Sequence, residues 1–315
     1  MGRLPPAEKL PLALRKNIRD EFDSNKADLE SQLSELLGTE WTVEVDPLAI
    51  WPYHNDGWAK ENLGSAIKGY INGAIYQLKN AVSKYGDEFK TELNALAPTH
   101  ILTLDFDEEG KISSGGCGVD IHEGKLRILF AEDYLGTNVD YCLENPKLLK
   151  ALNAVPPTEE LPYSFVVRQG IRERWDAEIG EVKAKIAAQL GKSADDITLN
   201  PNFAATFDRL TQATEANENI YVKDWQDNFA SFILGYFDAL RSHLEYVKVG
   251  EDELVQEGLL EAVEKNEYAF RLVDSLQDSS YNEVVIEDGV LYLQTTPENF
   301  GVNQNDVAKK LVDRL

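Results

Sequence analysis

Hydrophobic residues in the first half of the chain recur with two different periods. From residue 10 to residue 36 they stand three or four positions apart, which predicts a helix with one buried face. Residues 58–82 repeat this spacing and predict a second, long helix, and the alternation over residues 42–46 predicts a short strand between the two helices. Three alternating segments then predict an antiparallel strand meander, followed by a terminal helix; the segments are residues 100–106, 118–122 and 126–130.

The second half of the chain predicts the same order of elements. A helical period begins near residue 168, and a long helix is predicted over residues 222–247. Three strands follow, at residues 270–275, 283–287 and 290–295. Runs of strands beside runs of helices, without strict alternation of strand and helix, favour an α+β fold.

Landmarks that lie outside these periods also recur in the same order. The segment LPPAEKLP at residues 4–11 reappears as VPPTEELP at residues 155–162. Since prolines and glycines do not belong to an amphipathic period, we interpret the chain as a tandem duplication. The other matching landmarks are Leu37-Gly38 with Leu190-Gly191, Trp58 with Trp225, Gly124 with Gly289, and Leu135 to Asn138 with Phe300 to Asn303.

A repeat of about 150 residues has the size of an independent domain. We therefore expect two α+β repeats, residues 1–154 and 155–315. Each has the predicted order helix, strand, helix, antiparallel meander, helix. Two similar domains in one chain usually pack about a pseudo-twofold axis, so we also expect a groove between them.

Composition excludes several classes of function. The chain has 55 acidic and 31 basic side chains, a net charge of -24, and such a surface repels phosphate backbones and anionic lipids. This charge disfavours nucleic acid and membrane surfaces as partners. No apolar stretch of about 18 residues is present, and the first residues lack the apolar core of a secretory signal. We expect a soluble cytoplasmic protein.

The two cysteines, Cys117 and Cys142, have no CxxC spacing and no histidine at ligand spacing. We expect reduced thiols, no metal site and no cofactor. A disulfide between the two cysteines would require that their segments touch.

The densest chemical signal is the loop from Trp51 to Trp58. Trp51, Tyr53 and Trp58 offer stacking area to a ligand, while His54 and Asp56 are the residue types of a general base and its orienting carboxylate. In the structural alternative, Trp51 and Tyr53 cover the core and Asp56 caps the next helix. The corresponding loop of the second half, residues 200–224, has no histidine, so a catalytic His54 would belong to one repeat only.

Asp120 and His122 form a second candidate, because alternate residues of a strand share one face. With Glu123, Glu132 and Asp133 nearby, they have the residue types of a metal site or a proton relay. The alternative is a solvent-facing strand edge that runs into a turn.

The glycine-rich segment Ser113 to Gly118 is a third candidate, as a phosphate cradle or as the setting of a nucleophilic Cys117. It lies between predicted strands and not before a helix, which favours a hairpin turn.

Two acidic runs remain, Asp105 to Glu109 and Glu251 to Glu264. Opposite charge accelerates the encounter with a basic partner. We therefore expect a non-catalytic binding protein that recognises a basic protein or a small ligand through the inter-domain groove. The alternative is a hydrolase or lyase that acts on a small polar substrate through His54 and Asp56.

Overall fold

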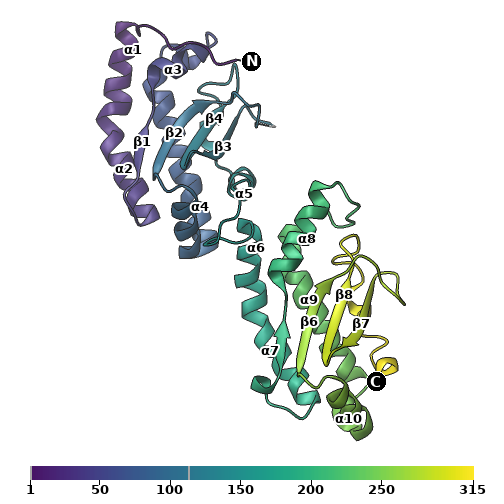
Figure 1. Ribbon diagram of the computed structural model, residues 1–315. Coiled ribbons are helices and arrows are strands. Elements are labelled where there is room, and N and C mark those ends of the chain that lie inside the picture. Colours follow the sequence, from purple (N-terminus) through teal and green to yellow (C-terminus); the bar gives the residue numbers. More distant parts are fainter. Residues whose placement is uncertain (1, 113) are drawn as a thin grey trace. The chain divides into compact units, whose positions relative to one another are not determined.

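The chain divides into two compact units, Met1–Pro156 and Pro157–Leu315 (Figure 1). This computed structural model describes residues 2–112 and 114–315. Each unit contains helices and one four-stranded mixed sheet, so the α+β class predicted from the sequence is confirmed.

The first helix of unit 1 is continuous but contains one π-helical turn, Ile18–Asp23. It buries Leu14, Phe22 and Leu33 on one side, as the hydrophobic period predicts. The helix ends at Gly38, whose φ of 74° lies in the left-handed region that favours glycine. The helices of unit 1 are α1 (Leu12–Asn17), α2 (Ser24–Leu37), α3 (Pro47–Ile50), α4 (Leu63–Leu96) and α5 (Asn145–Asn153).

The sheet of unit 1 has the strand order β1-β2-β4-β3. Strands β1, β2 and β4 run parallel, and only β3 runs antiparallel to its neighbour β4. The strands are β1 (Thr42–Glu44), β2 (Ile101–Phe106), β3 (Cys117–His122) and β4 (Lys125–Phe130).

The predicted antiparallel meander is therefore wrong. The long connection after β2 carries the chain to the sheet edge, where it forms β3, and the tight turn at Glu123 and Gly124 returns it as β4 between β2 and β3. Both turn residues have positive φ, as a two-residue hairpin turn requires. Alternation of apolar and polar residues identifies strands but not their partners, which explains the error.

The sheet of unit 2 has the same arrangement, with strand order β5-β6-β8-β7 and one antiparallel pair, β7 with β8. The terminal helix predicted for this unit is wrong, because only the 3₁₀ turns Gln304–Asp306 and Val312–Arg314 follow β8 among the described residues. The first helix of unit 2 also contains one π-helical turn, Ile171–Trp175. The helices are α6 (Phe165–Gly170), α7 (Asp176–Gln189), α8 (Phe203–Glu215), α9 (Trp225–Tyr246) and α10 (Glu253–Ala262). The strands are β5 (Thr198–Asn200), β6 (Glu267–Leu272), β7 (Asn282–Glu287) and β8 (Val290–Thr295).

The strand registers of the two units correspond residue by residue. Leu102 of β2 pairs with Leu126 of β4, and Tyr268 of β6 pairs with Leu291 of β8. Cys117 pairs with Phe130 in β3–β4, and Asn282 occupies the position of Cys117 in β7–β8. A residue of one sheet can therefore be assigned its counterpart in the other.

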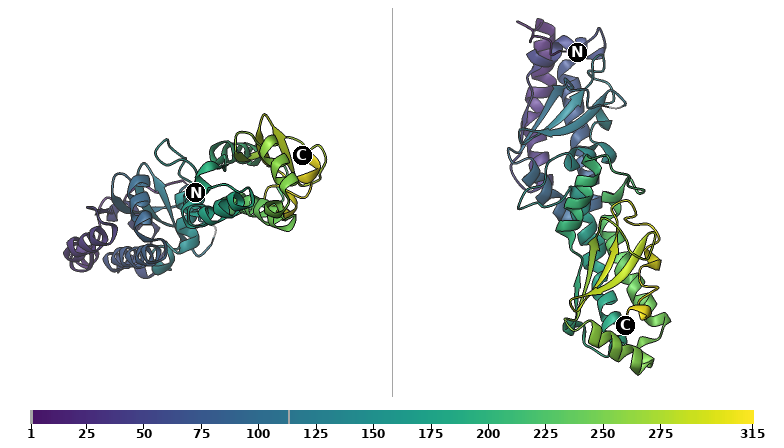
Figure 2. Two further views of the ribbon diagram at one scale, coloured as in Figure 1. Left: turned by 90° about the horizontal axis from the view of Figure 1, so that it is seen from below. Right: turned by 45° about the vertical axis from the view of Figure 1, so that its right-hand side comes forward.

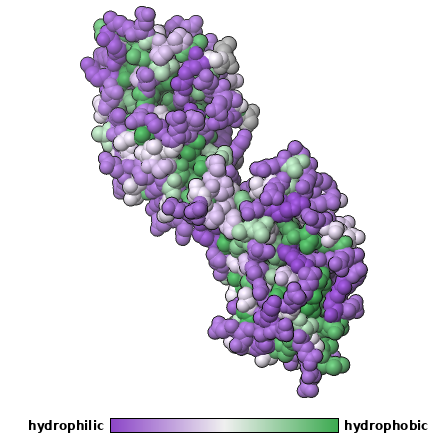
Figure 3. All heavy atoms as spheres, viewed as in Figure 1, coloured by the Kyte–Doolittle hydropathy of each residue, from purple (hydrophilic) through white to green (hydrophobic). Residues whose placement is uncertain are grey.

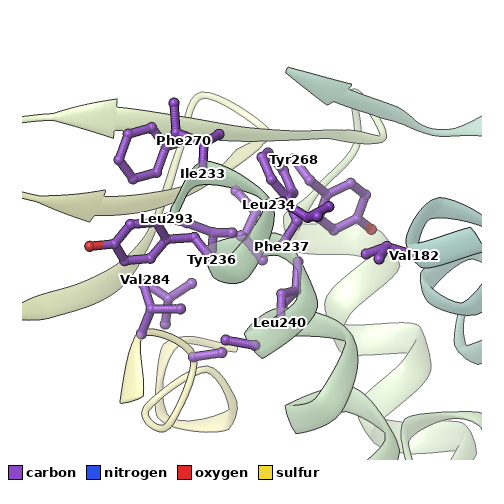
Figure 4. Packing of buried hydrophobic residues seen from close by; sticks show 14 of the residues in the cluster. Val182, Ile233, Leu234, Tyr236, Phe237, Leu240, Tyr268, Phe270, Val284 and Leu293 are labelled. Carbon is purple, nitrogen blue, oxygen red and sulfur yellow. The ribbon is translucent and has the colours of Figure 1, made fainter. Parts of the chain in front are cut away.

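In each unit the helices pack on one face of the sheet (Figures 1 and 2). Figure 4 shows this contact in unit 2, where Tyr236 and Phe237 of α9 meet Tyr268 and Phe270 of β6. These four side chains are fully buried. Burial of a large apolar side chain stabilises a fold by about 1.5–3 kcal/mol, so this contact contributes much of the stability of the unit.

Among the described residues, no helix combines the length and the apolar character needed to cross a membrane.

Gly73 of α4 allows the close approach of the turn that follows β4. A β-carbon there would lie 2.4 Å from the carbonyl oxygen of Val139 and 2.8 Å from the Cα of Asp140. Because both neighbours are backbone atoms, we expect Gly73→Ala to lower the free energy of unfolding by about 2 kcal/mol in urea denaturation. Gly180 is the control: it is an exposed helical glycine with open space around it, so Gly180→Ala should stabilise the protein. Equal effects of the two substitutions would contradict this packing.

Candidate functional site

Tyr53, one of the predicted ligand-binding aromatics, belongs to the core of unit 1. It lies in the 3₁₀ turn Trp51–Tyr53, its exposed fraction is 6%, and its ring stacks on Phe106 with a centroid distance of 4.2 Å. Its hydroxyl oxygen accepts a hydrogen bond from the backbone N–H of Leu4 at 2.7 Å. Tyr53 thus anchors the loop and the N-terminal segment to the sheet.

Trp51 and Trp58 remain accessible at the surface. Trp51 is half-buried, its ring lies 5.0 Å from the ring of His54, and its Nε1–H donates to the carbonyl oxygen of Lys60 at 3.3 Å. The exposed fraction of Trp58 is 55%. The structure therefore separates the three aromatics: one supports the core, and two border the surface.

His54 and Asp56 are adjacent, but the Asp56 carboxylate does not orient the imidazole through Nδ1. The backbone N–H of Asp56 donates to His54 Nδ1 at 3.0 Å, while the Asp56 carboxylate accepts from Lys60 Nζ at 2.6 Å. This bond to Lys60 holds the pKa of Asp56 below its usual value. In this conformation the Asp56 carboxylate is hydrogen-bonded to Lys60 and not to His54.

Asp56 is also not the cap of the long helix. The N-cap position of α4 is Asn62, and Gly57 precedes the intervening turn Trp58–Lys60. The long helix therefore starts at Leu63, five residues after the start that the periodicity predicts.

A network of charged side chains lies on the face of the unit 1 sheet opposite α4. Asp120 of β3 is buried and accepts from Arg127 Nε at 2.9 Å, from Arg127 Nη2 at 2.7 Å and from Lys111 Nζ at 2.7 Å. Burial raises the pKa of Asp120, but the hydrogen bonds from Arg127 and Lys111 outweigh it, so the pKa lies below the usual value. Asp120 is an ionised member of a structural ion network.

The network continues toward the N-terminal segment. Arg127 Nη1 lies 3.4 Å from an Asp105 carboxylate oxygen, and Arg3 Nη2 donates to Asp105 at 2.6 Å. These residues line a cavity of about 370 Å³. His122 borders the same cavity, so Asp120 and His122 share one face, as the strand alternation predicts. The remaining charged residues that line the cavity are Asp107, Glu108, Glu109, Lys111, Glu123 and Lys125.

The Asp120 carboxylate is held by cationic side chains, which leaves it poorly suited to a metal ion. Glu132 and Asp133 are exposed in the loop after β4. Within residues 2–112 and 114–315, no group of three or more His, Cys, Asp or Glu side chains has an arrangement that could hold a metal ion.

Residues 114–116 of the glycine-rich segment form the turn before β3. Gly115 and Gly116 have positive φ, and β3 follows directly, so the segment does not open a helix as a phosphate loop does. Ser113 lies outside the described residues.

The structure brings Cys117 and Cys142 together. Both thiols lie against the carbonyl oxygen of Asn138, at 3.3 Å from Cys117 Sγ and 3.7 Å from Cys142 Sγ. Both cysteines are buried and neither forms a disulfide. The sequence contains no signal for this contact, because the turn that carries Cys142 reaches β3 only through tertiary packing.

The two acidic runs differ in their surroundings. In the first run, Asp105 and Glu108 contact Arg3, and Glu109 contacts Lys111 at 3.0 Å. In the second run, three glutamates of α10 are exposed, and no ion-pair partner for them lies among the residues that the structure describes; they are Glu253, Glu257 and Glu261. Figure 3 shows that hydrophilic residues cover much of the visible surface.

Comparisons of the chain with known protein families, with curated proteins and with solved structures found no match.

The buried ion network generates a prediction for Asp120. Asp120→Asn leaves Arg127 and Lys111 without their shared carboxylate, so we expect it to lower the free energy of unfolding by about 3 kcal/mol at pH 7. Since the folded-state pKa of Asp120 is depressed, the contribution is present above about pH 4 and is lost as the pH falls further. Urea denaturation at pH 7 and at pH 3 measures both effects.

The control for Asp120→Asn is Glu44→Gln. Glu44 pairs with Lys125 at 2.9 Å at the surface of the same unit. Its substitution should change the free energy of unfolding by less than about 1 kcal/mol. A loss as large as that of Asp120→Asn would contradict the special role of the buried pair.

Proposed function

We propose that this protein is a non-catalytic binding protein for a basic protein partner, and that the exposed face of α10 is its docking surface. This α10 glutamate face consists of Glu253, Glu257 and Glu261 with the neighbouring Leu254. The observation that carries the proposal is the row of three exposed glutamates, for which the described part of the chain holds no basic partner.

The spacing of these glutamates destabilises the free helix. Residues four positions apart are neighbours on a helix surface, and like charges there cost about 0.2–0.5 kcal/mol per pair. Acidic residues at the same spacing from a basic residue on α7 and α9 form ion pairs: Glu181 pairs with Lys185, and Arg241 pairs with Glu245. A basic partner would relieve the repulsion between the glutamates of α10, and this relief would contribute to the free energy of binding.

Leu254 adds an apolar contact to this face. Its exposed fraction is 80%, and it lies one helical turn before Glu257. Charged groups accelerate encounter and select the partner, whereas a buried apolar contact contributes to affinity. The combination fits a basic segment that also carries an apolar side chain.

We also infer that the chain arose by tandem duplication, and the inference assigns the α10 glutamate face to unit 2 alone. The equivalence of the two units is supported by their shared strand registers. It is also supported by two buried leucines: the carbonyl oxygen of Leu93 accepts the last N–H of α4, and that of Leu259 accepts the last N–H of α10. The counterpart of α10 is then the end of α4, where Asp87 pairs with Lys90 at 2.7 Å. After duplication, the second copy exposes three glutamates one turn apart on this helix, whereas the first copy exposes Glu88 beside the Asp87–Lys90 pair.

The cytoplasm is the compartment that we propose, since both thiols would stay reduced there. The alternative function, a hydrolase or lyase that uses His54 and Asp56, would require the Asp56 carboxylate to leave Lys60 and turn to the imidazole. We therefore rank the binding function first.

Binding of a synthetic decalysine peptide, measured by fluorescence anisotropy at low salt, tests the proposal. The double variant Glu257→Gln/Glu261→Gln should weaken binding about fivefold, because two interactions of roughly 0.5 kcal/mol each are lost. The control Glu178→Gln/Glu181→Gln on α7 removes the same charge from residues that pair with Arg174 and Lys185, and should change binding less than about twofold.

Stability provides an independent readout for the same variants. Neutralising the α10 glutamate face should leave the free energy of unfolding unchanged or raise it, whereas the α7 control should not raise it. Equal weakening of decalysine binding by both variants would show a diffuse charge effect and overturn the assignment to α10.

A further inference from the structure

The turn after β4 places a second thiol beside the first residue of β3. Asn138 has positive φ and begins the 3₁₀ turn Val139–Tyr141, and Cys142 follows directly. The carbonyl oxygen of Asn138 contacts both sulfur atoms, and the Cys142 thiol also lies 3.7 Å from the carbonyl oxygen of Val139. The two sulfurs are therefore neighbours before any oxidation.

A lysine ammonium group lies against Cys117. Lys147 of α5 has its Nζ 3.7 Å from Cys117 Sγ and donates to the carbonyl oxygen of Tyr141 at 2.9 Å, which holds it in place. The neighbouring Cys142 thiol and the ammonium group of Lys147 together lower the pKa of Cys117 to about 7, although burial opposes them. Burial raises the pKa of Cys142, so this residue remains a thiol.

A small cavity of about 40 Å³ reaches Cys117. A space of this size holds a water molecule, so a reagent of similar size can approach Cys117 through it. Cys117 and Cys142 are otherwise buried, with exposed fractions of 0% and 1%. Lys147 and Lys150 line the cavity and make it electropositive.

We propose that Cys117 and Cys142 form a dithiol site that hydrogen peroxide oxidises to an intramolecular disulfide, with Cys117 as the attacking cysteine and Cys142 as the resolving one. The site adds a redox chemistry that the proposed binding function does not include. It depends on a pair of thiols, a fixed cation and a small cavity beside Cys117.

The reaction consists of two displacements. The Cys117 thiolate attacks one peroxide oxygen, the O–O bond breaks, and the departing hydroxide takes a proton from solvent to leave as water; Cys117 becomes a sulfenic acid. The Cys142 sulfur then attacks the Cys117 sulfur, the S–O bond breaks, and the departing hydroxide takes the Cys142 thiol proton to form a second water. Two thiols are oxidised while one peroxide is reduced, and a small-molecule dithiol reverses the change.

Unit 2 has the same strand and turn at this place but no cysteines. Asn282 occupies the position of Cys117, and its Nδ2 donates to the carbonyl oxygen of Asn303 at 2.9 Å, as the Cys117 thiol does to Asn138. The buried Val307 follows the 3₁₀ turn Gln304–Asp306, as Cys142 follows the 3₁₀ turn Val139–Tyr141 in unit 1. The chain thus provides matched replacements, Cys117→Asn and Cys142→Val, that its own fold accommodates.

The test treats the reduced full-length protein with one equivalent of hydrogen peroxide. We expect both free thiols to disappear, the monomer mass to fall by about 2 Da, and dithiothreitol to restore both thiols when the protein is unfolded in urea. Cys142→Val should stop at a Cys117 sulfenic acid that dimedone labels when the oxidised protein is unfolded in urea, and Cys117→Asn should react at least about tenfold more slowly than the wild type. Circular dichroism confirms that each variant is folded.

The pH profile of the wild-type rate provides a measurement that needs no variant. With a Cys117 pKa of about 7, the thiolate fraction, and with it the rate, should rise about tenfold from pH 6 to pH 8. An ordinary thiol of pKa about 9 would give a rise nearer a hundredfold. The titratable and charged groups around the pair are Tyr70, Asp140, Glu144, Lys147, Lys111 and Lys150.

Three results would overturn the proposal: an unchanged thiol count after peroxide, equal peroxide rates for the two single variants, or a hundredfold pH dependence. A disulfide that appears only between molecules would also overturn it, because the geometry requires both sulfurs in one chain.

Discussion

The burial of one sheet face against a long helix is the constraint on which each unit depends. In unit 1, Leu102, Leu104 and Ile128 point toward the helices and are almost fully buried. Because strand residues alternate in direction, the same strands must present their intervening residues to the opposite face. Asp105 and Arg127 occupy those positions, so the ion network follows from the burial of the apolar face.

The hydroxyl of a buried tyrosine then fixes the turn after the central strand. Tyr70 of α4 accepts a hydrogen bond from the backbone N–H of Gly136 at 3.0 Å, and Tyr236 of α9 accepts one from Gly301 at 3.2 Å. This bond positions the turn whose Asn138 carbonyl meets both thiols. In unit 2 the same turn meets the amide of Asn282. A shared scaffold thus supports a thiol pair in one unit and a purely structural hydrogen bond in the other.

Net charge alone does not describe how this protein uses its acidic residues. The run from Asp105 to Glu109 is tied to Arg3 and Lys111, so it serves the fold of unit 1. The glutamates of α10 stand one turn apart at the surface and repel one another. The same composition therefore yields an internal network in one place and a candidate docking surface in another, according to which basic residues the fold brings near.

The amino-acid sequence by itself determined the α+β class, the positions of most strands and helices, and the face that Asp120 and His122 share, because side-chain periodicity is a local property of the chain. The sequence did not predict helix α8. The long helix α4 starts five residues after its predicted start, because residues 58–62 form a 3₁₀ turn and a helix cap although their hydrophobic spacing fits a helix.

Only the tertiary structure decided that β4 pairs in parallel with β2, that Lys60 and not His54 holds Asp56, and that Cys117 meets Cys142. These contacts join segments or atoms whose mutual distance depends on the packing of the whole unit, and no local pattern encodes that distance.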